Sequence, residues 1–279
     1  MYTHKYPIPG NDLSGVVVEA HPASRFKPGD EVFGMLAADR PGAWAEYAVA
    51  LEDEVALKPA QLSWAEAAAL PLSGMTAYEA LFVHAGIPVP GKDISSNREL
   101  AGQSDKKVLV TGAAGAVGIY VVQLAHLAGV HITAATSSNE RNEKFLRELG
   151  ADECIEYPGL KTESCKDVYD IVIDTVGGET LVTAWSCVKA SGTLITVDSS
   201  SWNFVEEHKK RGIAREGVKA LFFIVEGGRA ALDMLAAFAS SGSLRVFVLD
   251  SYPLQRAREA YDFANGRVTG RGKVILSVE

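Results

Sequence analysis

The chain has 279 residues and a mass of 29.8 kDa, a length typical of about two domains. It carries 27 Lys and Arg residues against 35 Asp and Glu residues, and the resulting charge of −8 argues against a nucleic-acid partner. Its three widely spaced cysteines disfavour a disulfide framework. Unbroken apolar runs, such as the one at 220–225, are too short to span a membrane. The first ten residues lack the apolar core of a signal peptide. We therefore expect a cytoplasmic protein with no membrane segment.

Residues 1–60 predict β structure, with strands at 15–19, 31–33 and 42–49 and Gly/Pro turn chemistry between them. The periodicity then changes. Ser63 and Glu66 have the spacing of a capping box before an Ala-rich helix that Pro71 should end. A second helix is expected at 76–85, followed by a Pro/Gly/Ser-rich surface loop at 86–106.

From residue 107 onwards, strands and helices alternate. Expected strands lie at 107–111, 130–135, 170–174, 193–197 and 220–225, and expected helices at 116–128, 140–149, 179–189 and 229–239. This alternation predicts an α/β fold with a doubly wound parallel sheet. The tail adds a strand at 244–249, a helix at 254–265 and a strand at 273–278.

The strongest local motif is the run TGAAGAVG at 111–118, which leaves a predicted strand and enters a predicted helix. Glycines at 112, 115 and 118 let the backbone approach a pyrophosphate, whose charge suits a helix N-terminus. A plain glycine-rich turn is the alternative. The strand–loop–helix context favours a dinucleotide site of the Rossmann type.

The end of the second strand indicates which dinucleotide binds. NAD sites usually carry Asp or Glu there, but this strand runs into TSSN at 136–139. Ser137, Ser138 and Arg141 could instead hold a 2′-phosphate, which favours NADP(H). Ser137 could also be the N-cap of the next helix with Glu140 as its partner, and both roles are compatible.

The order of these motifs resembles the medium-chain dehydrogenase/reductase superfamily, in its zinc-independent quinone oxidoreductase-like (enoyl reductase) branch. The resemblance covers nearly the whole chain and rests on PGNDLSG at 9–15, FKPGDEVF at 26–33, GAWAEY at 42–47, PLSGMTAY at 71–78, the glycine loop, ELGAD at 148–152, DTVGG at 174–178 and GRGKVIL at 270–276. It implies a GroES-like β-rich domain formed by both chain ends, with residues 1–72 and 244–279, around a Rossmann NADP-binding domain at 73–243. It also implies a homodimer.

The resemblance implies cofactor contacts residue by residue, although it names no catalytic residue. Thr76 would lie near the nicotinamide ribose, and Phe223 to Val225 near the carboxamide; core packing is the alternative for Phe223 and Val225. Tyr157 would lie beside the adenosine phosphate or else be a surface turn residue. The remaining expected contacts are Ala114, Gly115, Ala116 and Val117 at the pyrophosphate, Ser137, Ser138 and Arg141 at the 2′-phosphate, Thr175, Val176, Gly177, Ser199 and Ser200 at the nicotinamide side, and Lys273.

No metal is expected, because Asn11-Asp12 stands where the zinc-dependent relatives carry His-Glu and three scattered cysteines cannot form their four-cysteine site. The implied activity is NADPH-dependent hydride transfer to a small-molecule quinone or α,β-unsaturated carbonyl, with substrate and proton donor left open. Family chains carry a longer segment before the motif at Pro9, so the GroES-like domain is expected to be shortened. The alternative is therefore a weakly active or inactive NADP-binding protein.

Overall fold

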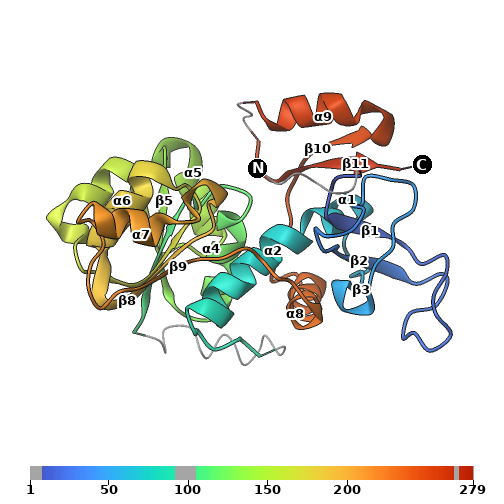
Figure 1. The fold of residues 1–279 in the computed structure, drawn as a ribbon, viewed down its shortest axis with the longest axis horizontal. Coiled ribbons are helices and arrows are strands. Elements are labelled where there is room, and N and C mark those ends of the chain that lie inside the picture. Colours follow the sequence, from blue (N-terminus) through green and yellow to red (C-terminus); the bar gives the residue numbers. More distant parts are fainter. Residues whose placement is uncertain (1–7, 92–104, 267–269, 279) are drawn as a thin grey trace. The chain divides into compact units, whose positions relative to one another are not determined.

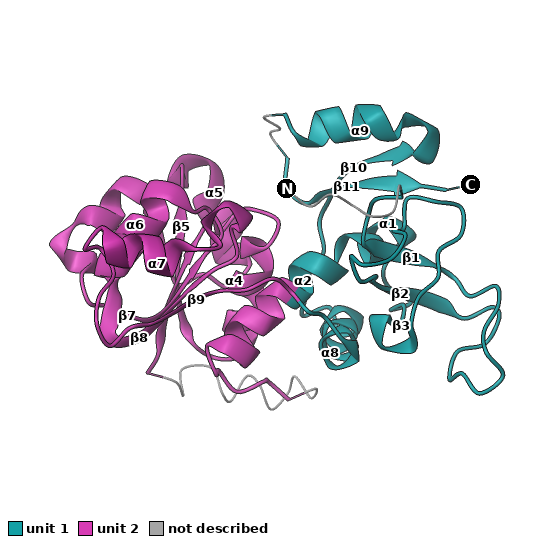
Figure 2. Cartoon of the chain, viewed as in Figure 1, with its two compact units in different colours: residues 1–75, 226–279 teal, residues 76–225 magenta. Residues whose placement is uncertain are grey.

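The computed structural model describes residues 8–91, 105–266 and 270–278, and the chain divides into two compact units (Figure 2). The first unit combines residues 1–75 with 226–279, and the second comprises residues 76–225. These boundaries compare with the expected ones at 72/73 and 243/244. The difference concerns mainly helix α8 (Arg229–Ser240), which packs on strand β3 (Val55–Leu57) of the first unit.

The second unit contains a six-stranded parallel sheet with the order β6-β5-β4-β7-β8-β9. Strands β4 and β7 are buried and rich in Val and Ile, as expected for a sheet covered by helices on both faces. The chain winds outward from β4 in one direction and from β7 in the other, so the strand order reverses between them. The strands are β4 (Lys107–Thr111), β5 (His131–Thr136), β6 (Glu153–Glu156), β7 (Tyr169–Asp174), β8 (Val188–Thr196) and β9 (Lys219–Phe222), and the helices are α4 (Gly118–Leu127), α5 (Asn139–Glu148), α6 (Gly178–Cys187) and α7 (Phe204–Lys210). Figure 1 shows helices α4, α5, α6 and α7 around this sheet. The doubly wound fold predicted from the sequence is confirmed.

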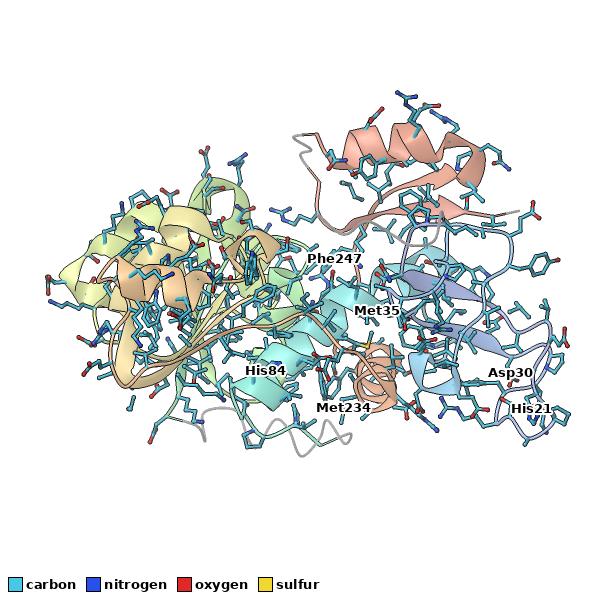
Figure 3. All side chains as sticks on the ribbon, in the orientation of Figure 1. His21, Asp30, Met35, His84, Met234 and Phe247 are labelled. Carbon is cyan, nitrogen blue, oxygen red and sulfur yellow. The ribbon has the colours of Figure 1, made fainter. Side chains whose placement is uncertain are left out.

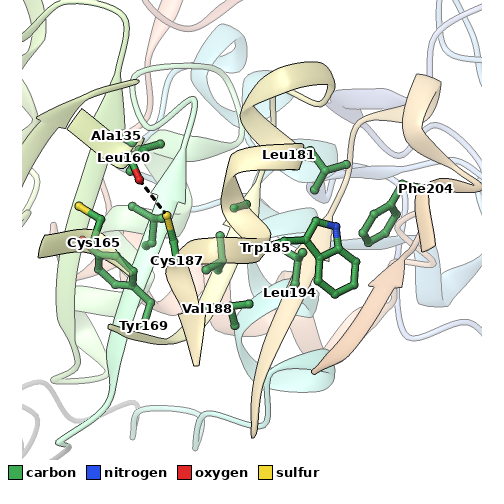
Figure 4. Close-up of a cluster of buried hydrophobic side chains, with 13 residues drawn as sticks. Ala135, Leu160, Cys165, Tyr169, Leu181, Trp185, Cys187, Val188, Leu194 and Phe204 are labelled. Carbon is green, nitrogen blue, oxygen red and sulfur yellow. Dashed lines mark hydrogen bonds between the residues drawn. The ribbon is translucent and has the colours of Figure 1, made fainter. Parts of the chain in front are cut away.

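One side of this sheet is sealed by a cluster of buried apolar side chains (Figure 4). Trp185 on α6 and Phe204 on α7 lie 6.0 Å apart, centroid to centroid, above the strands. The Trp185 indole Nε1 donates to Nδ1 of the buried His208, at 2.8 Å. Packing of this kind fixes α6 against β7 and β8 and α7 against β9.

The first unit contains a three-stranded antiparallel sheet and a separate parallel pair of strands. The sheet has the order β1-β2-β3, with β1 at Asp12–Val16 and β2 at Glu31–Met35. The parallel pair joins β10 (Val248–Pro253) to β11 (Lys273–Ser277), and α9 (Ala257–Ala264) connects them. Helix α1 (Trp64–Ala69) contacts β1 and also β10 and β11, so the two ends of the chain share one unit.

Local signals explain how the helices begin. Ser63 caps α1 as predicted: its Oγ accepts from the Glu66 backbone N–H at 3.2 Å, and the Glu66 carboxylate accepts from the Ser63 N–H. Helix α2 (Pro71–Tyr78) begins at the proline, before the expected start at residue 76, because a first-turn residue needs no N–H donor. It continues as a π-helix, η2 (Glu79–His84).

Other predicted elements differ from the structure. Residues 42–49, which are described, form no strand; the N–H groups of Gly42, Ala43 and Trp44 donate to the carbonyls of residues 8–10 instead. Strand β6 and helix α7 were not predicted. Among the described residues, no helix is long and apolar enough to cross a membrane.

Candidate nucleotide-binding site

A pocket of about 560 Å³ lies in the second unit at the carboxyl ends of β4, β5, β7 and β8. This volume is within the usual range for small-molecule sites. In open α/β sheets, ligands bind outside the carboxyl ends of the strands where the strand order reverses, which here is between β4 and β7. The lining residues are Gly112, Ala114, Gly115, Ala116, Val117, Thr136, Ser137, Asn142, Tyr157, Thr175, Val197, Asp198 and Ser199.

The glycine loop is close-packed, and side chains do not fit at two of its positions. Gly112 has φ +66°, and a Cβ atom there would lie 2.2 Å from Thr175 Oγ1. A Cβ at Gly118 would lie 2.3 Å from the Gly112 carbonyl oxygen. The glycines let the loop 112–117 turn tightly between β4 and α4. The N-terminus of α4 at the end of this loop is the kind of position that binds a phosphate.

A buried carboxylate joins three strand ends at the pocket. Asp174, fully buried at the end of β7, accepts hydrogen bonds from Thr111 Oγ1 at 2.6 Å and Thr196 Oγ1 at 2.8 Å. It also accepts from the Gly177 backbone N–H at 2.9 Å. Burial raises the pKa of the Asp174 carboxyl, and these hydrogen bonds partly offset the effect. Since Thr111 and Thr196 end β4 and β8, the network fixes the strand ends relative to one another.

Two further hydroxyls border the β5 and β6 end of the pocket. The Tyr157 hydroxyl is hydrogen-bonded to the backbone of Gly112; burial raises the pKa of this hydroxyl more than the hydrogen bond lowers it. Thr136 Oγ1, at the tip of β5, accepts from Asn142 Nδ2 at 2.6 Å. The tip of the second strand of the Rossmann unit is thus neutral and polar.

The structure brings together eight of the eighteen predicted contact residues. Ala114, Gly115, Ala116, Val117, Ser137, Tyr157, Thr175 and Ser199 all line the pocket. Their roles toward a cofactor remain predictions. Gly112, Thr136, Asn142, Val197 and Asp198 also line it, although only Gly112 had been singled out, as part of the loop. Val197 and Asp198 directly follow β8, so the rule that sites lie at carboxyl ends of strands would have found them.

The other predicted residues lie outside the lining. Val176 and Gly177 are in the turn after β7, Ser200 lies next to Ser199, Thr76 is on α2, and Phe223 to Val225 follow β9. Phe223 packs on His84, with 4.2 Å between ring centroids, and Figure 3 shows His84 at the end of its helix. Lys273 belongs to the first unit, where its ammonium pairs with Asp12.

The start of α5 differs from the predicted capping box. Ser138, and not Ser137, is the N-cap, and its side chain makes no cap hydrogen bond. The Asn139 backbone N–H donates instead to Glu156 Oε1, at 2.8 Å, from the end of β6. The exposed Arg141 lies on α5, outside the lining.

A metal site is absent from the part of the chain that the structure describes. No group of three or more His, Cys, Asp or Glu side chains comes together there with the geometry to hold an ion. Cys165 and Cys187 are buried and Cys154 is half-buried, all three as free thiols. The described side chains therefore do not fit a tetrahedral zinc centre.

Comparison with known proteins gives relatives over the whole length. The chain is 37% identical to a probable zinc-binding oxidoreductase, mitochondrial, of Arthroderma benhamiae, covering 99% of this chain and 81% of the relative. It is 32% identical to a chloroplast envelope quinone oxidoreductase homolog of Arabidopsis thaliana, covering 96% and 79%. The solved quinone oxidoreductase from Coxiella burnetii superposes with a TM-score of 0.78 at 28% identity, covering 98% and 81%.

The names of these relatives correct the expected location. One is a mitochondrial and another a chloroplast envelope protein, which points away from a plainly cytoplasmic location. Composition and the lack of a recognisable signal segment were the basis of the cytoplasmic prediction, and neither property separates the cytosol from an organelle interior.

Two family models match separate parts of the chain. The alcohol dehydrogenase GroES-like domain matches residues 1–60, and the zinc-binding dehydrogenase model matches residues 149–276. The relatives named above are oxidoreductases and match nearly the entire chain. On these grounds, together with the parallel sheet and its glycine loop, the chain belongs to the medium-chain dehydrogenase/reductase superfamily, in the quinone oxidoreductase-like branch.

Proposed function

We propose that this protein is an NADPH-dependent, zinc-independent reductase that transfers hydride to a quinone or an α,β-unsaturated carbonyl compound. The observation that carries the proposal is the pocket at the carboxyl ends of the strands, with a close-packed glycine loop on one side and a neutral tip at Thr136 on the other. A dinucleotide pyrophosphate fits beside the loop, because small residues at 112–118 leave the backbone open to it.

The neutral tip supports NADPH over NADH. A carboxylate at the end of the second strand would bond the ribose 2′-OH and repel a 2′-phosphate. Thr136, Ser137 and Asn142 provide hydroxyl and amide groups at this end of the pocket, and none of them carries a negative charge. They accommodate a phosphate oxygen as well as a hydroxyl.

The substrate class follows from the chemistry that a nicotinamide can perform without a metal. The bound cofactor would supply the hydride, and a conjugated carbonyl accepts it readily since the arriving charge spreads onto oxygen. The protein then contributes orientation and hydrogen bonds. Thr175, Asp198 and Ser199, after β7 and β8, are the polar groups of the pocket on the side opposite β5. We assign them the nicotinamide half of the cofactor.

Zinc independence is supported by the donor set of the described residues, in which no three metal-binding side chains converge. Hydride acceptors that are already electron-poor do not need a Lewis acid to polarise them. Elemental analysis of the purified protein should find far less than one zinc per chain, and a chelator should leave turnover unchanged. Stoichiometric zinc, with activity lost to the chelator and restored by the metal, would contradict this part of the proposal.

The central test separates binding from turnover. NADPH and NADH are titrated by calorimetry, and NADPH oxidation is then followed with a panel of quinones and enones. We expect tighter binding of NADPH and oxidation with at least one compound of either class. Binding without oxidation across the panel would instead identify a nucleotide-binding protein without reductase activity, and failure to bind either nucleotide would refute the site itself.

A further inference from the structure

Glu156 connects strand β6 to the start of helix α5, next to the pocket. Its carboxylate Oε1 accepts the Asn139 backbone N–H at 2.8 Å, and the Asn139 side-chain Nδ2 donates to the Cys154 carbonyl at 3.2 Å. Because Asn139 is the first residue of α5, the carboxylate occupies the position where an anion is stabilised by the helix. The contact is exposed.

The residues around this contact place it at one particular end of the pocket. Ser137, two residues before Asn139, lines the pocket, and so does Tyr157, which directly follows Glu156. Asn142, one helical turn after Asn139, lines it as well. This is the β5 end, where a Rossmann site receives the adenosine ribose. An anionic group added to that ribose would meet a helix start that already holds a carboxylate.

We propose that Glu156 is a specificity-determining residue that weakens binding of 2′-phosphorylated nucleotides relative to unphosphorylated ones; the proposal rests on the proposed dinucleotide site. A 2′-phosphate carries nearly two negative charges, so it competes for the same backbone N–H and is repelled by the carboxylate. The neutral tip at Thr136 admits NADPH, whereas Glu156 limits how strongly NADPH is preferred. Neither the glycine loop nor the strand tip alone then sets the cofactor preference.

The test is the variant Glu156→Gln, which keeps an oxygen acceptor for the Asn139 N–H and removes the charge. Its affinities for adenosine 2′,5′-bisphosphate and 5′-AMP, and for NADPH and NADH, are measured by calorimetry at pH 7.5. We expect the 2′-phosphorylated member of each pair to bind the variant about three- to tenfold more tightly than it binds the unmodified protein, because one partly exposed negative charge has been removed. The affinity for the unphosphorylated member should change less than about twofold, because that ligand brings no 2′-phosphate near the carboxylate.

Glu153→Gln is the matched control, because it removes the same charge from the opposite end of β6. It should leave both ratios unchanged. Glu156→Ala, which removes charge and acceptor together, should raise the same preference as Glu156→Gln while lowering the melting temperature. An unchanged ratio in Glu156→Gln, or an equal gain in Glu153→Gln, would overturn the proposal. If the unmodified protein binds none of the four ligands, the dinucleotide site itself is refuted; if it binds them and only the ratios fail to move, the role of Glu156 alone is refuted.

Discussion

At the residue scale, Asp174 is the side chain on which the geometry of the pocket depends most. Both carboxylate oxygens accept from threonine hydroxyls, and Oδ2 also accepts the Gly177 N–H. Every group facing this carboxylate in these bonds is a donor. The Gly177 N–H can only donate, so an amide at the same place would have to turn its oxygen toward Gly177 and Thr196 and its NH₂ group toward Thr111, whose hydroxyl would have to change from donor to acceptor.

We therefore expect Asp174→Asn to lower the free energy of unfolding by about 1–3 kcal/mol and to weaken NADPH binding about tenfold. Urea unfolding and calorimetric titration measure the two effects. Asp170→Asn is the control on the same strand. Asp170 is half-buried and pairs with Lys189, so removing its charge should lower the free energy of unfolding by less than about 1 kcal/mol. Similar losses in the two variants would argue against a special role for Asp174.

His208 gives a prediction on pH. Burial, with a smaller effect of the Arg211 guanidinium, lowers the pKa of His208 below its ordinary value of 6.5. The folded state thus binds this proton more weakly than the unfolded state does. The stability that neutral His208 contributes is therefore fully present above about pH 6.5 and is lost as the pH falls through the lowered pKa of the folded state. The neutral ring also accepts the Trp185 N–H, and protonation of Nδ1 removes that acceptor.

His208→Gln keeps an acceptor for Trp185 but does not titrate in this range. Urea unfolding midpoints are compared at pH 7.5 and pH 5.0. We expect the midpoint of the unmodified protein to fall more between the two values than that of the variant. Parallel losses would show that other groups control acid stability.

At the scale of secondary-structure elements, the Asp12–Lys273 pair joins β1 to β11, and Asp12 Oδ1 also accepts the Leu72 N–H at the start of α2. Burial raises the pKa of the Asp12 carboxyl although the Lys273 ammonium opposes the shift. Lys273→Met leaves this carboxylate without its cation and should lower the free energy of unfolding by about 2–4 kcal/mol.

The double variant Asp12→Asn with Lys273→Met should recover much of that loss, because no unpaired charge remains. Denaturant unfolding of the two single variants and the double variant measures the coupling. NADPH affinity is measured in parallel. If the losses of unfolding free energy in the single variants simply add in the double variant, and Lys273→Met binds NADPH much more weakly, Lys273 is instead the cofactor contact that the family resemblance implies.

How far the elements could be predicted depended on burial. Strands β4 and β7 are central and apolar, so their residues identify them. Strand β6 pairs with β5 alone and has acidic residues at both ends, so its four residues carry little strand signal. The run at 42–49 has strand-like residues, but its backbone bonds to residues 8–10, a tertiary contact that periodicity does not reveal.

The sequence predicted the lining residues that are contiguous along the chain and missed those that tertiary packing brings to the pocket. The glycine loop is contiguous, so one motif gives Gly112 and Ala114 to Val117. Asn142 lines the pocket because its side chain on α5 points toward Thr136. Glu156 lies at the end of β6, and its carboxylate bonds to the start of α5. Such contacts join residues that no local spacing relates. The helix-capping prediction at Ser137 failed for the same reason.

At the scale of the whole molecule, the edge strand of the parallel sheet bears on the oligomeric state. Strand β9 is the last strand in the sheet order, and the apolar run at 220–225 continues past its end. Ile224 in this run is 54% exposed. An open apolar strand edge is an aggregation liability unless something covers it, and a second copy related by a two-fold axis covers it symmetrically.

We therefore predict a homodimer that pairs through β9 and the residues after it. Light scattering at micromolar concentration should give twice the chain mass of 29.8 kDa. Ile224→Glu should shift the protein toward the monomer, because each copy would bring an unpaired carboxylate to the centre of the contact. Tyr47→Glu is the control: this side chain is 73% exposed on the first unit and should leave the mass unchanged. A monomeric unmodified protein, or dissociation caused equally by both variants, would show that the β9 edge is not the dimer contact.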